Sequence, residues 1–426
     1  MTGGVLTGGV RRMLSRVAGA AALALVALAA LSGCSVPGNA SHGVGPRFSL
    51  SSDPSPVWQP VGIRMLALPP GEHVTVTATV TSGAVWTSRA VYAVPPDGEV
   101  DLATQAPLSA AFHGADGMGL FWSLANSAGT QATSDETWGE SGMAVALSAL
   151  IDGRRVAHTT VHRTGLASAA PSRAVFDDGI SGDFFEPKTS SAGLRPAVIV
   201  FDGTDSGTPT GVLAASEIAA LGYPALALSA FGSAGQVDLT HVFPAERFAS
   251  ALSWLRAQPG VDPERILTFG TSRGAQLALW TAVAYSDTVY GAIAPAGTTG
   301  LICNSPVPNP SVTINGSWVP CNSGTRTVNA AAVLDLSGIR GPLVLGCAGH
   351  DEQLDNGCAW LAAGAKARGQ HPGDTMLVAP DATHLFYVPP YTPLYLPGAP
   401  YAQATENARV RLWTAIAATL RASREG

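Results

Sequence analysis

Hydrophobic and polar residues alternate along the first third of the chain, from about residue 57 to residue 161. The run Val74–Val80 reads Val-Thr-Val-Thr-Ala-Thr-Val, so apolar side chains recur at every second position. This period of two is typical of a strand with one buried face. The segments 86–92 and 143–150 have the same character, and turn residues stand at 95–98. Short strands at this spacing predict a small β-sandwich.

From about residue 193 the pattern changes to continuous apolar runs that alternate with helical periodicity. Ala197-Val-Ile-Val-Phe201 is such a run, as expected of a strand buried on both faces. Further strands are predicted at 224–228, 265–269, 289–294, 342–347 and 375–378, and helices at 212–221, 245–258, after residue 272 and at 402–422. Strands separated by helices predict an α/β fold with a mostly parallel sheet covered on both faces. Residues 306–324 are rich in Pro, Ser, Asn and Gly, and we interpret them as a loop or lid near the site.

The first 33 residues have the pattern of an export signal. Arginines within residues 11–16 precede an apolar run, 17–31, that is too short to span a bilayer comfortably. The run ends in Leu31-Ser-Gly-Cys34, which resembles a bacterial lipobox and implies lipidation of Cys34 and anchoring on the outer face of the cell membrane. A plain secretory signal is the alternative. Residues 34–56 are then expected to form a flexible tether.

Composition narrows the classes of function. The 426 residues suffice for two domains, and with 46% hydrophobic and 13% charged residues the chain can bury large cores. The net charge of −6 is spread thinly, and no Lys/Arg cluster stands beyond the N-terminus, which argues against a nucleic-acid partner.

Four cysteines beyond Cys34 form an even set that an exported protein can oxidise: Cys303, Cys321, Cys347 and Cys358. Three pairings are possible. We predict the local one, Cys303–Cys321 and Cys347–Cys358, because it closes short loops. The spacing does not fit a zinc site, and no metal is expected.

The sequence around Ser272 has the features of a nucleophile elbow. An apolar run ends at Gly270, the pattern Gly-Thr-Ser-Arg-Gly follows, and an Ala/Leu-rich segment begins after Gly274. This strand–turn–helix context places a serine at the tip of a tight turn, where the flanking glycines avoid crowding. An ordinary glycine-rich turn is the alternative. The N–H groups at the start of the following helix can face an oxyanion.

A serine nucleophile needs a base, and the base needs an orienting acid. In α/β-hydrolases these follow in the order Ser, Asp/Glu, His, each in a loop after a strand. Asp351 follows the predicted strand 342–347, with Glu352 and then Asp355 as alternatives. Of nine histidines, His384 falls after the last predicted strand and is the predicted base.

Two N–H donors are expected to stabilise the oxyanion. One is the backbone N–H of Arg273, and the other belongs to the loop after strand 197–201, near Thr204 or Asp205. The predicted organisation is a signal peptide at 1–33, a tether at 34–56, a β-sandwich at 57–165 and an α/β-hydrolase domain at 166–426. No cofactor is expected for this chemistry.

Several segments of both predicted domains resemble the acyl-CoA thioesterase and bile acid-CoA:amino acid N-acyltransferase (BAAT) family. The similar segments are 85–90, 98–102, 118–123, 197–201, 221–228, 270–274 and 384–394, and the resemblance covers roughly residues 57 to 422. It implies a β-sandwich before an α/β-hydrolase domain, with Ser272, Asp351 and His384 as the triad. Serine is typical of the family's thioesterases, whereas its amino-acid-conjugating members have cysteine.

The chain departs from the family pattern in three ways. Gln276 stands where an acidic residue is usual, the acid loop lacks an expected tryptophan, and the cysteine pairs are additional.

From the predicted triad, the export signal and the family resemblance we expect a membrane-anchored hydrolase of acyl thioesters, similar to fatty acyl-CoA, or of lipid esters. The alternatives are an acyltransferase to an amine or alcohol and a non-catalytic lipid-binding lipoprotein. Export would separate the enzyme from cytosolic coenzyme A thioesters.

Overall fold

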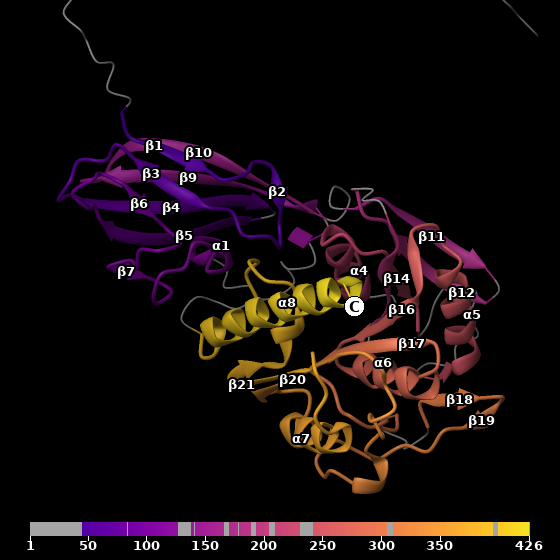
Figure 1. The fold of residues 1–426 in the computed structure, drawn as a ribbon. Coiled ribbons are helices and arrows are strands. Elements are labelled where there is room, and N and C mark those ends of the chain that lie inside the picture. Colours follow the sequence, from indigo (N-terminus) through magenta and orange to yellow (C-terminus); the bar gives the residue numbers. More distant parts are fainter. Residues whose placement is uncertain are drawn as a thin grey trace, which may run out of the picture. The chain divides into compact units, whose positions relative to one another are not determined.

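The structure is a computed structural model, and it describes residues 45–82, 84–126, 138–139, 141–165, 170–177, 179–188, 193–203, 209–230, 242–304, 310–394 and 399–425. Residues Val44–Gly426 form one compact unit (Figure 1). Cys34 and the export signal lie outside the described residues, so the lipidation prediction stays a prediction. Among the described residues, no helix is both long and apolar enough to cross a membrane.

The first part of this unit consists of two sheets, as the alternating pattern predicts for a β-rich region. The seven-stranded sheet contains β2 (Ser55–Pro56), β10 (Arg154–Thr164), β9 (Met143–Ile151), β4 (His73–Ser82), β5 (Ala84–Ala93), β7 (Ser109–Ala110) and β8 (Ala125–Asn126). The three-stranded sheet contains β1 (Arg47–Leu50), β3 (Ile63–Leu66) and β6 (Val100–Asp101). A short helix, α1 (Gly119–Trp122), follows. Alternate residues of β4, such as Val74 and Val76, are fully buried, which confirms the predicted inward face.

The tether predicted for residues 34–56 is wrong for its last part. β1 pairs antiparallel with β3 in a register that places Phe48 opposite Met65, and the side chain of Phe48 packs against the core. β2 pairs with β10, and the hydroxyl of Ser55 accepts a hydrogen bond of 2.6 Å from Nη1 of the buried Arg163. The sequence did not predict these few packed residues because the segment as a whole has a polar composition.

The second part of the unit contains an eight-stranded sheet. Its order is β11 (Ser172–Asp177), β12 (Ile180–Phe185), β14 (Ala225–Leu228), β13 (Arg195–Phe201), β16 (Val261–Gly270), β17 (Val289–Pro295), β20 (Leu343–His350) and β21 (Thr375–Thr383). The strands from β14 to β21 are parallel, and only the edge formed by β11 and β12 is antiparallel. The predicted mostly parallel sheet is therefore confirmed, and the carboxyl ends of its six parallel strands share one edge.

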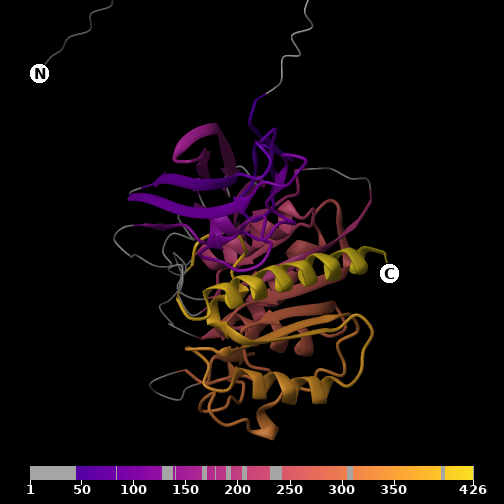
Figure 2. The ribbon, with the colours of Figure 1, turned by 90° about the vertical axis from the view of Figure 1, so that its left-hand side faces the viewer.

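Helices cover both faces of this sheet. Alternate residues of β13 belong to two different hydrophobic clusters, Val198 and Val200 to one and Ile199 to the other. The first cluster includes α4 (Pro209–Ala220) and α8 (Ala402–Glu425), and the second includes α5 (Ala245–Arg256), α6 (Arg273–Ala284) and α7 (Gly357–Arg368). α8 packs along β21, as Figure 2 shows in yellow and orange.

The segment 306–324, predicted to be a loop or lid, is only partly irregular. It contains a hairpin of β18 (Val312–Ile314) and β19 (Ser317–Trp318), and β18 pairs with β15 (Phe243–Pro244). Residues 305–309 are outside the described part. The alternation of Val312 and Ile314 with polar residues was the available signal for a strand. A short 3-10 turn, η1 (Ala330–Ala332), comes later.

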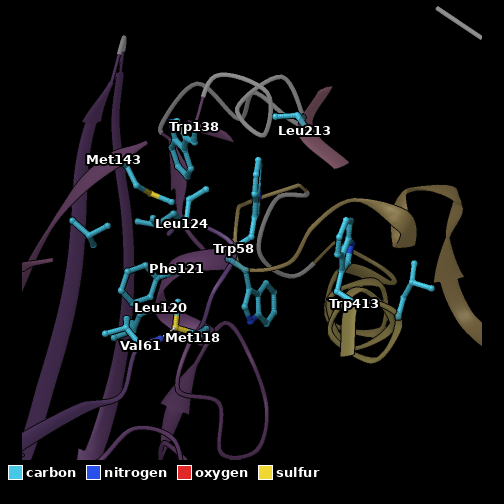
Figure 3. Close-up of a cluster of buried hydrophobic side chains, with 14 of the residues drawn as sticks. Trp58, Val61, Met118, Leu120, Phe121, Leu124, Trp138, Met143, Leu213 and Trp413 are labelled. Carbon is cyan, nitrogen blue, oxygen red and sulfur yellow. Dashed lines mark hydrogen bonds between the residues drawn. The ribbon is translucent and has the colours of Figure 1, made fainter. Parts of the chain in front are cut away.

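The two predicted domains share a hydrophobic core. Trp58 from the first part and Leu213 of α4 belong to the same buried cluster, together with Trp413 of α8 (Figure 3). A Cβ on Gly139 would lie 2.7 Å from Trp58 and 2.9 Å from Leu213, so only a glycine fits between them. The predicted boundary at residue 165/166 therefore marks a change of sheet, and residues on either side of it pack as one body.

A buried carboxyl group lies at this junction. Glu217 of α4 is 4% exposed, and its Oε2 has no hydrogen-bond partner among the described residues. Burial raises the pKa of Glu217 to about 8, although the positive charge of Arg163 partly opposes the shift. The carboxyl group is therefore protonated in the folded chain at neutral pH.

This pKa shift predicts how stability depends on pH. The folded chain holds the Glu217 proton more tightly than the unfolded chain, whose glutamate titrates near 4.5, so the free energy of unfolding falls as the pH rises from about 4.5 to about 8. Glu217→Gln should remove this part of the pH dependence. Urea unfolding of both proteins at pH 5 and pH 8 measures it, and equal pH dependence in the two proteins would contradict the assignment. Burial also raises the pKa of Asp202, to about 7, and this group contributes equally to the pH dependence of the wild type and of Glu217→Gln.

Candidate active site

Ser272 stands in a strained turn between β16 and α6. Its backbone has φ 52° and ψ −119°, a left-handed conformation that is uncommon for any residue other than glycine. A Cβ on Gly270 would clash with the carbonyl oxygen of Gly274, and a Cβ on Gly274 would clash with that of Asp202. Both glycines are thus required by the close approach of the backbone, as expected for a nucleophile elbow.

The predicted oxyanion site lies partly outside the described residues. Arg273 follows Ser272 directly and is the first residue of α6, at the positive end of the helix dipole. Thr204 and Asp205 are outside the described part, so the second donor stays a prediction. The last described residue before them is Gly203, on which a Cβ would lie 3.9 Å from the Cβ of Ser272. The loop after β13 therefore begins beside the serine.

Asp351 and His384 meet at the ends of two neighbouring strands. β20 and β21 are parallel, and their register places His350 opposite Thr383, so the next residue of each strand leaves the sheet at the same point. Nδ1 of His384 lies 2.9 Å from Oδ2 of Asp351, and both side chains are at least 95% buried. Oδ1 of Asp351 accepts the backbone N–H groups of Gln353 and Leu354 at 2.9 and 2.8 Å. These bonds fix the carboxylate toward the imidazole.

The two alternative acids have other contacts. Glu352 accepts the backbone N–H of His384 at 3.0 Å through Oε2, so it holds the main chain of the histidine and not its ring. Asp355 pairs with Arg326 at 3.5 Å, and both side chains are largely exposed. Of the three acidic candidates, Asp351 is the one whose carboxylate is bonded to the imidazole.

Three other histidines of the described part make different contacts. His162 pairs with Asp53 at 3.1 Å, and Nε2 of His371 lies 3.0 Å from the carbonyl oxygen of Arg340. His350 stacks on the ring of Tyr401, with 3.9 Å between ring centroids. Within the described residues, no group of three or more His, Cys, Asp and Glu side chains is placed to hold a metal ion.

The cysteines pair locally, as predicted: Cys303 with Cys321 and Cys347 with Cys358. The second bridge joins Cys347 within β20 to Cys358 in the first turn of α7, so it closes the short segment that carries Asp351. The first bridge closes the segment that contains the β18–β19 hairpin.

We expect the Cys347–Cys358 bridge to hold the acid loop in place. A variant with Cys347→Ser and Cys358→Ser should unfold at a lower temperature, since a loop of this length contributes roughly 3 kcal/mol in the chain-entropy description. Its turnover per folded molecule should also fall, because Asp351 loses part of its support. Thermal unfolding and turnover of this variant, compared with Cys303→Ser plus Cys321→Ser, measure both effects. Unchanged stability and turnover would show that the bridge has no such role.

Gln276, noted as a departure from the family pattern, has a clear structural role. Its side chain is buried in α6, one turn after Ser272, and its Oε1 accepts the backbone N–H of Ile302 at 2.7 Å. Ile302 precedes the Cys303–Cys321 bridge. The amide thus ties the disulfide-closed segment to the nucleophile helix.

Sequence reasoning missed the buried charges of α8 that hold the segment after His384. Glu406 and Arg409 are 3% and 1% exposed and lie three residues apart on the apolar face of the helix. Oppositely charged residues on that face, between Ala402 and Leu412, were the available signal.

Known proteins with similar sequences and structures were found for this chain. Residues 58–175 match the family model described as the acyl-CoA thioester hydrolase/BAAT N-terminal region. Acyl-coenzyme A thioesterase 1 of Rattus norvegicus is 27% identical over 274 residues, which is 60% of this chain and 62% of the relative. Acyl-coenzyme A amino acid N-acyltransferase 1 of Mus musculus is 26% identical over 360 residues, 79% of this chain and 85% of the relative.

The chain is therefore similar to members of the acyl-CoA thioesterase/BAAT family, and its residues 58–175 match that family's N-terminal region. It spans less than two thirds of the rat thioesterase. Among solved structures, a bacterial heroin esterase is similar with a TM-score of 0.41 and 19% identity, over 59% of this chain and 85% of that one. A dienelactone hydrolase from Klebsiella pneumoniae has a TM-score of 0.43 and 17% identity, over 59% and 98%.

Proposed function

We propose that this chain is a serine hydrolase that cleaves acyl thioesters or esters through an acyl-Ser272 intermediate. The observation that carries the proposal is the 2.9 Å hydrogen bond between Nδ1 of His384 and Oδ2 of Asp351, at the same edge of the sheet as the strained Ser272 turn. A hydrogen bond at Nδ1 leaves Nε2 as the nitrogen that exchanges a proton with the serine. The relatives' names support acyl thioesters, similar to fatty acyl-CoA, as the substrate class.

In the proposed reaction the hydroxyl oxygen of Ser272 attacks the acyl carbonyl carbon while Nε2 of His384 accepts the hydroxyl proton. The oxyanion is stabilised by the backbone N–H of Arg273 and by a second donor from the loop that contains Thr204 and Asp205. Collapse expels the thiolate or alkoxide, which takes the proton from His384. Water, deprotonated by the same imidazole, then attacks the acyl-serine. The bond between the acyl carbon and the oxygen of Ser272 breaks, His384 returns the proton to that oxygen, and the free acid leaves. Asp351 orients the ring and stabilises the imidazolium throughout.

Transfer of the acyl group to an amine or alcohol is the second candidate, because the mouse N-acyltransferase matches 79% of this chain. The two reactions share the acyl-serine and differ in whether water or another nucleophile resolves it. The serine at position 272 favours hydrolysis by water, since the family members that conjugate amino acids have a cysteine as the nucleophile.

A lipid anchor at Cys34 is part of the proposal. It rests on Leu31-Ser-Gly-Cys34 at the end of the apolar run, and it places the substrate in the cell envelope. Mass spectrometry of the mature N-terminal peptide tests it, and an unmodified Cys34 would exclude lipidation.

The hydrolase proposal is tested with the folded wild-type protein and two reagents. A fluorophosphonate should form a covalent adduct on the peptide that contains Ser272. A panel of acyl-CoA thioesters and 4-nitrophenyl esters of increasing chain length should give free acid. Formation of an acylated amine with added amine acceptors would favour the transferase. If the folded protein forms no adduct and turns over no substrate, the remaining candidate is a non-catalytic lipoprotein that binds lipid.

A further inference from the structure

The segment that contains His384 is rich in proline, and beyond a 3-10 turn it is not part of a helix or strand. We call residues 383–392 the histidine strap. It begins at Thr383, contains the 3-10 turn η2 (His384–Tyr387) and continues through Pro389 and Pro390. Because proline has no backbone N–H, this part of the strap cannot form a ladder with a neighbouring strand. Its carbonyl groups need donors from elsewhere if they are buried.

Arg409 of α8 supplies these donors. Its Nε donates to the carbonyl oxygen of Val388 at 3.1 Å, and its Nη1 donates to that of Thr392 at 2.8 Å. Its Nη2 donates to the carbonyl oxygen of Pro389 and, at 2.9 Å, to the hydroxyl of Thr392. The guanidinium is thus enclosed by the strap, and its side chain is only 1% exposed.

Glu406 completes this clamp. Its Oε2 accepts from Nη1 of Arg409 at 2.6 Å, and its Oε1 accepts the backbone N–H of Tyr391 at 2.9 Å. The carboxylate therefore balances the buried positive charge and holds a further strap residue. A buried ion pair is costly unless its remaining hydrogen bonds are made, and here the strap makes them.

α8 also holds the two sides of His384 itself. The hydroxyl of Thr405 accepts the backbone N–H of Thr383 at 3.1 Å, and Nε1 of Trp413 donates to the carbonyl oxygen of Tyr387 at 3.0 Å. The base is therefore fixed on both sides by one rigid helix. Sites held by helices keep catalytic groups closer to their productive geometry than free loops do.

We propose that Arg409, held by Glu406, is a positioning residue that keeps the imidazole of His384 aligned with Asp351 and Ser272. The inference rests on the proposed function. Arg409 acts through the strap and does not touch the reacting atoms. Its loss should displace the base without changing the acyl-binding surface, so it should lower kcat and leave KM nearly unchanged. A displacement of the order of 1 Å costs about 100-fold in rate.

The test compares Arg409→Met, which keeps an unbranched side chain but removes the guanidinium, with Arg411→Met, which changes an exposed arginine of the same helix. We expect kcat to fall between about 10-fold and 100-fold in Arg409→Met, with KM within about twofold, and both constants to stay unchanged in Arg411→Met. The proton between His384 and Asp351 should give a far-downfield signal in one-dimensional proton NMR. That signal should broaden or vanish in Arg409→Met and persist in the control.

Two further variants keep the proposal testable if Arg409→Met does not fold. Arg409→Lys keeps the charge and loses the planar fork, so it should fold and have an intermediate kcat. Thr392→Val removes one strap contact without leaving a buried charge, and it should lower kcat less. Full kcat and an unchanged NMR signal in folded Arg409→Lys and Thr392→Val would overturn the inference. Failure of fluorophosphonate labelling in the wild type would instead refute the hydrolase proposal, and the NMR comparison would still measure the effect of Arg409 on His384.

Discussion

Ser272→Ala should lower turnover of acyl thioesters on the order of 10⁶-fold, because the oxyanion donors and substrate binding alone retain only a small part of the catalysis. The change removes one oxygen atom from a turn that is fixed by Gly270, Gly274 and the start of α6. We therefore expect folding to be retained. Turnover measured with the best thioester of the panel, together with loss of fluorophosphonate labelling, checks this prediction.

The strained backbone of Ser272 provides an independent control. Its φ of 52° costs on the order of 1 to 3 kcal/mol for a residue with a Cβ. Ser272→Gly relieves this cost, whereas Ser272→Ala does not, so the glycine variant should unfold at a higher urea concentration than the alanine variant. Both should be inactive. Substantial residual turnover in either variant would show that the hydroxyl is not the nucleophile.

Asp351→Asn should lower kcat by about 10⁴-fold while the protein stays folded. The asparagine keeps the shape of the side chain, but an amide cannot stabilise the imidazolium and favours the wrong tautomer of His384. Glu352→Gln changes the neighbouring carboxylate in the same way. Its amide oxygen can still accept the backbone N–H of His384, so we expect less than about a 10-fold fall.

This matched pair distinguishes the two adjacent acids. Steady-state kinetics of both variants, with Asp355→Asn as an exposed control, give the comparison. A mild effect of Asp351→Asn with a severe effect of Glu352→Gln would reverse the assignment. Equal severe effects would mean that anchoring the backbone of His384 matters as much as orienting its ring.

The local pattern of the sequence predicted most elements of the sheet and its helices. Continuous apolar runs gave β13, β16 and β20 within a few residues, because strands buried on both faces leave little room for polar side chains. Elements that depend on partners were missed. β1 and β2 lie in polar sequence and are strands only because β3 and β10 pair with them.

The sequence predicted the residue types and chain order of the candidate site, with Asp351 as the acid, but it left Glu352 open as an alternative. Asp351 and Glu352 are adjacent and chemically alike, and which of them faces the imidazole depends on the direction in which the chain leaves β20. The clamp formed by Glu406 and Arg409 was also missed. Opposite charges on the apolar face of α8 were a signal that these two residues are buried, but the backbone carbonyl groups that Arg409 binds carry no sequence signal.

The amino-acid sequence by itself determined the mostly parallel sheet, the elbow around Ser272, the order of serine, acid and histidine, and the local cysteine pairs. These features follow from short-range rules, namely hydrophobic period, glycine at crowded turns and short loops between cysteines. Only the tertiary structure decided the shared core across the predicted domain boundary, the choice of Asp351 over Glu352 and the support of His384 by α8. Each of these depends on contacts between residues far apart along the chain, whose geometry is set by packing and not by local pattern.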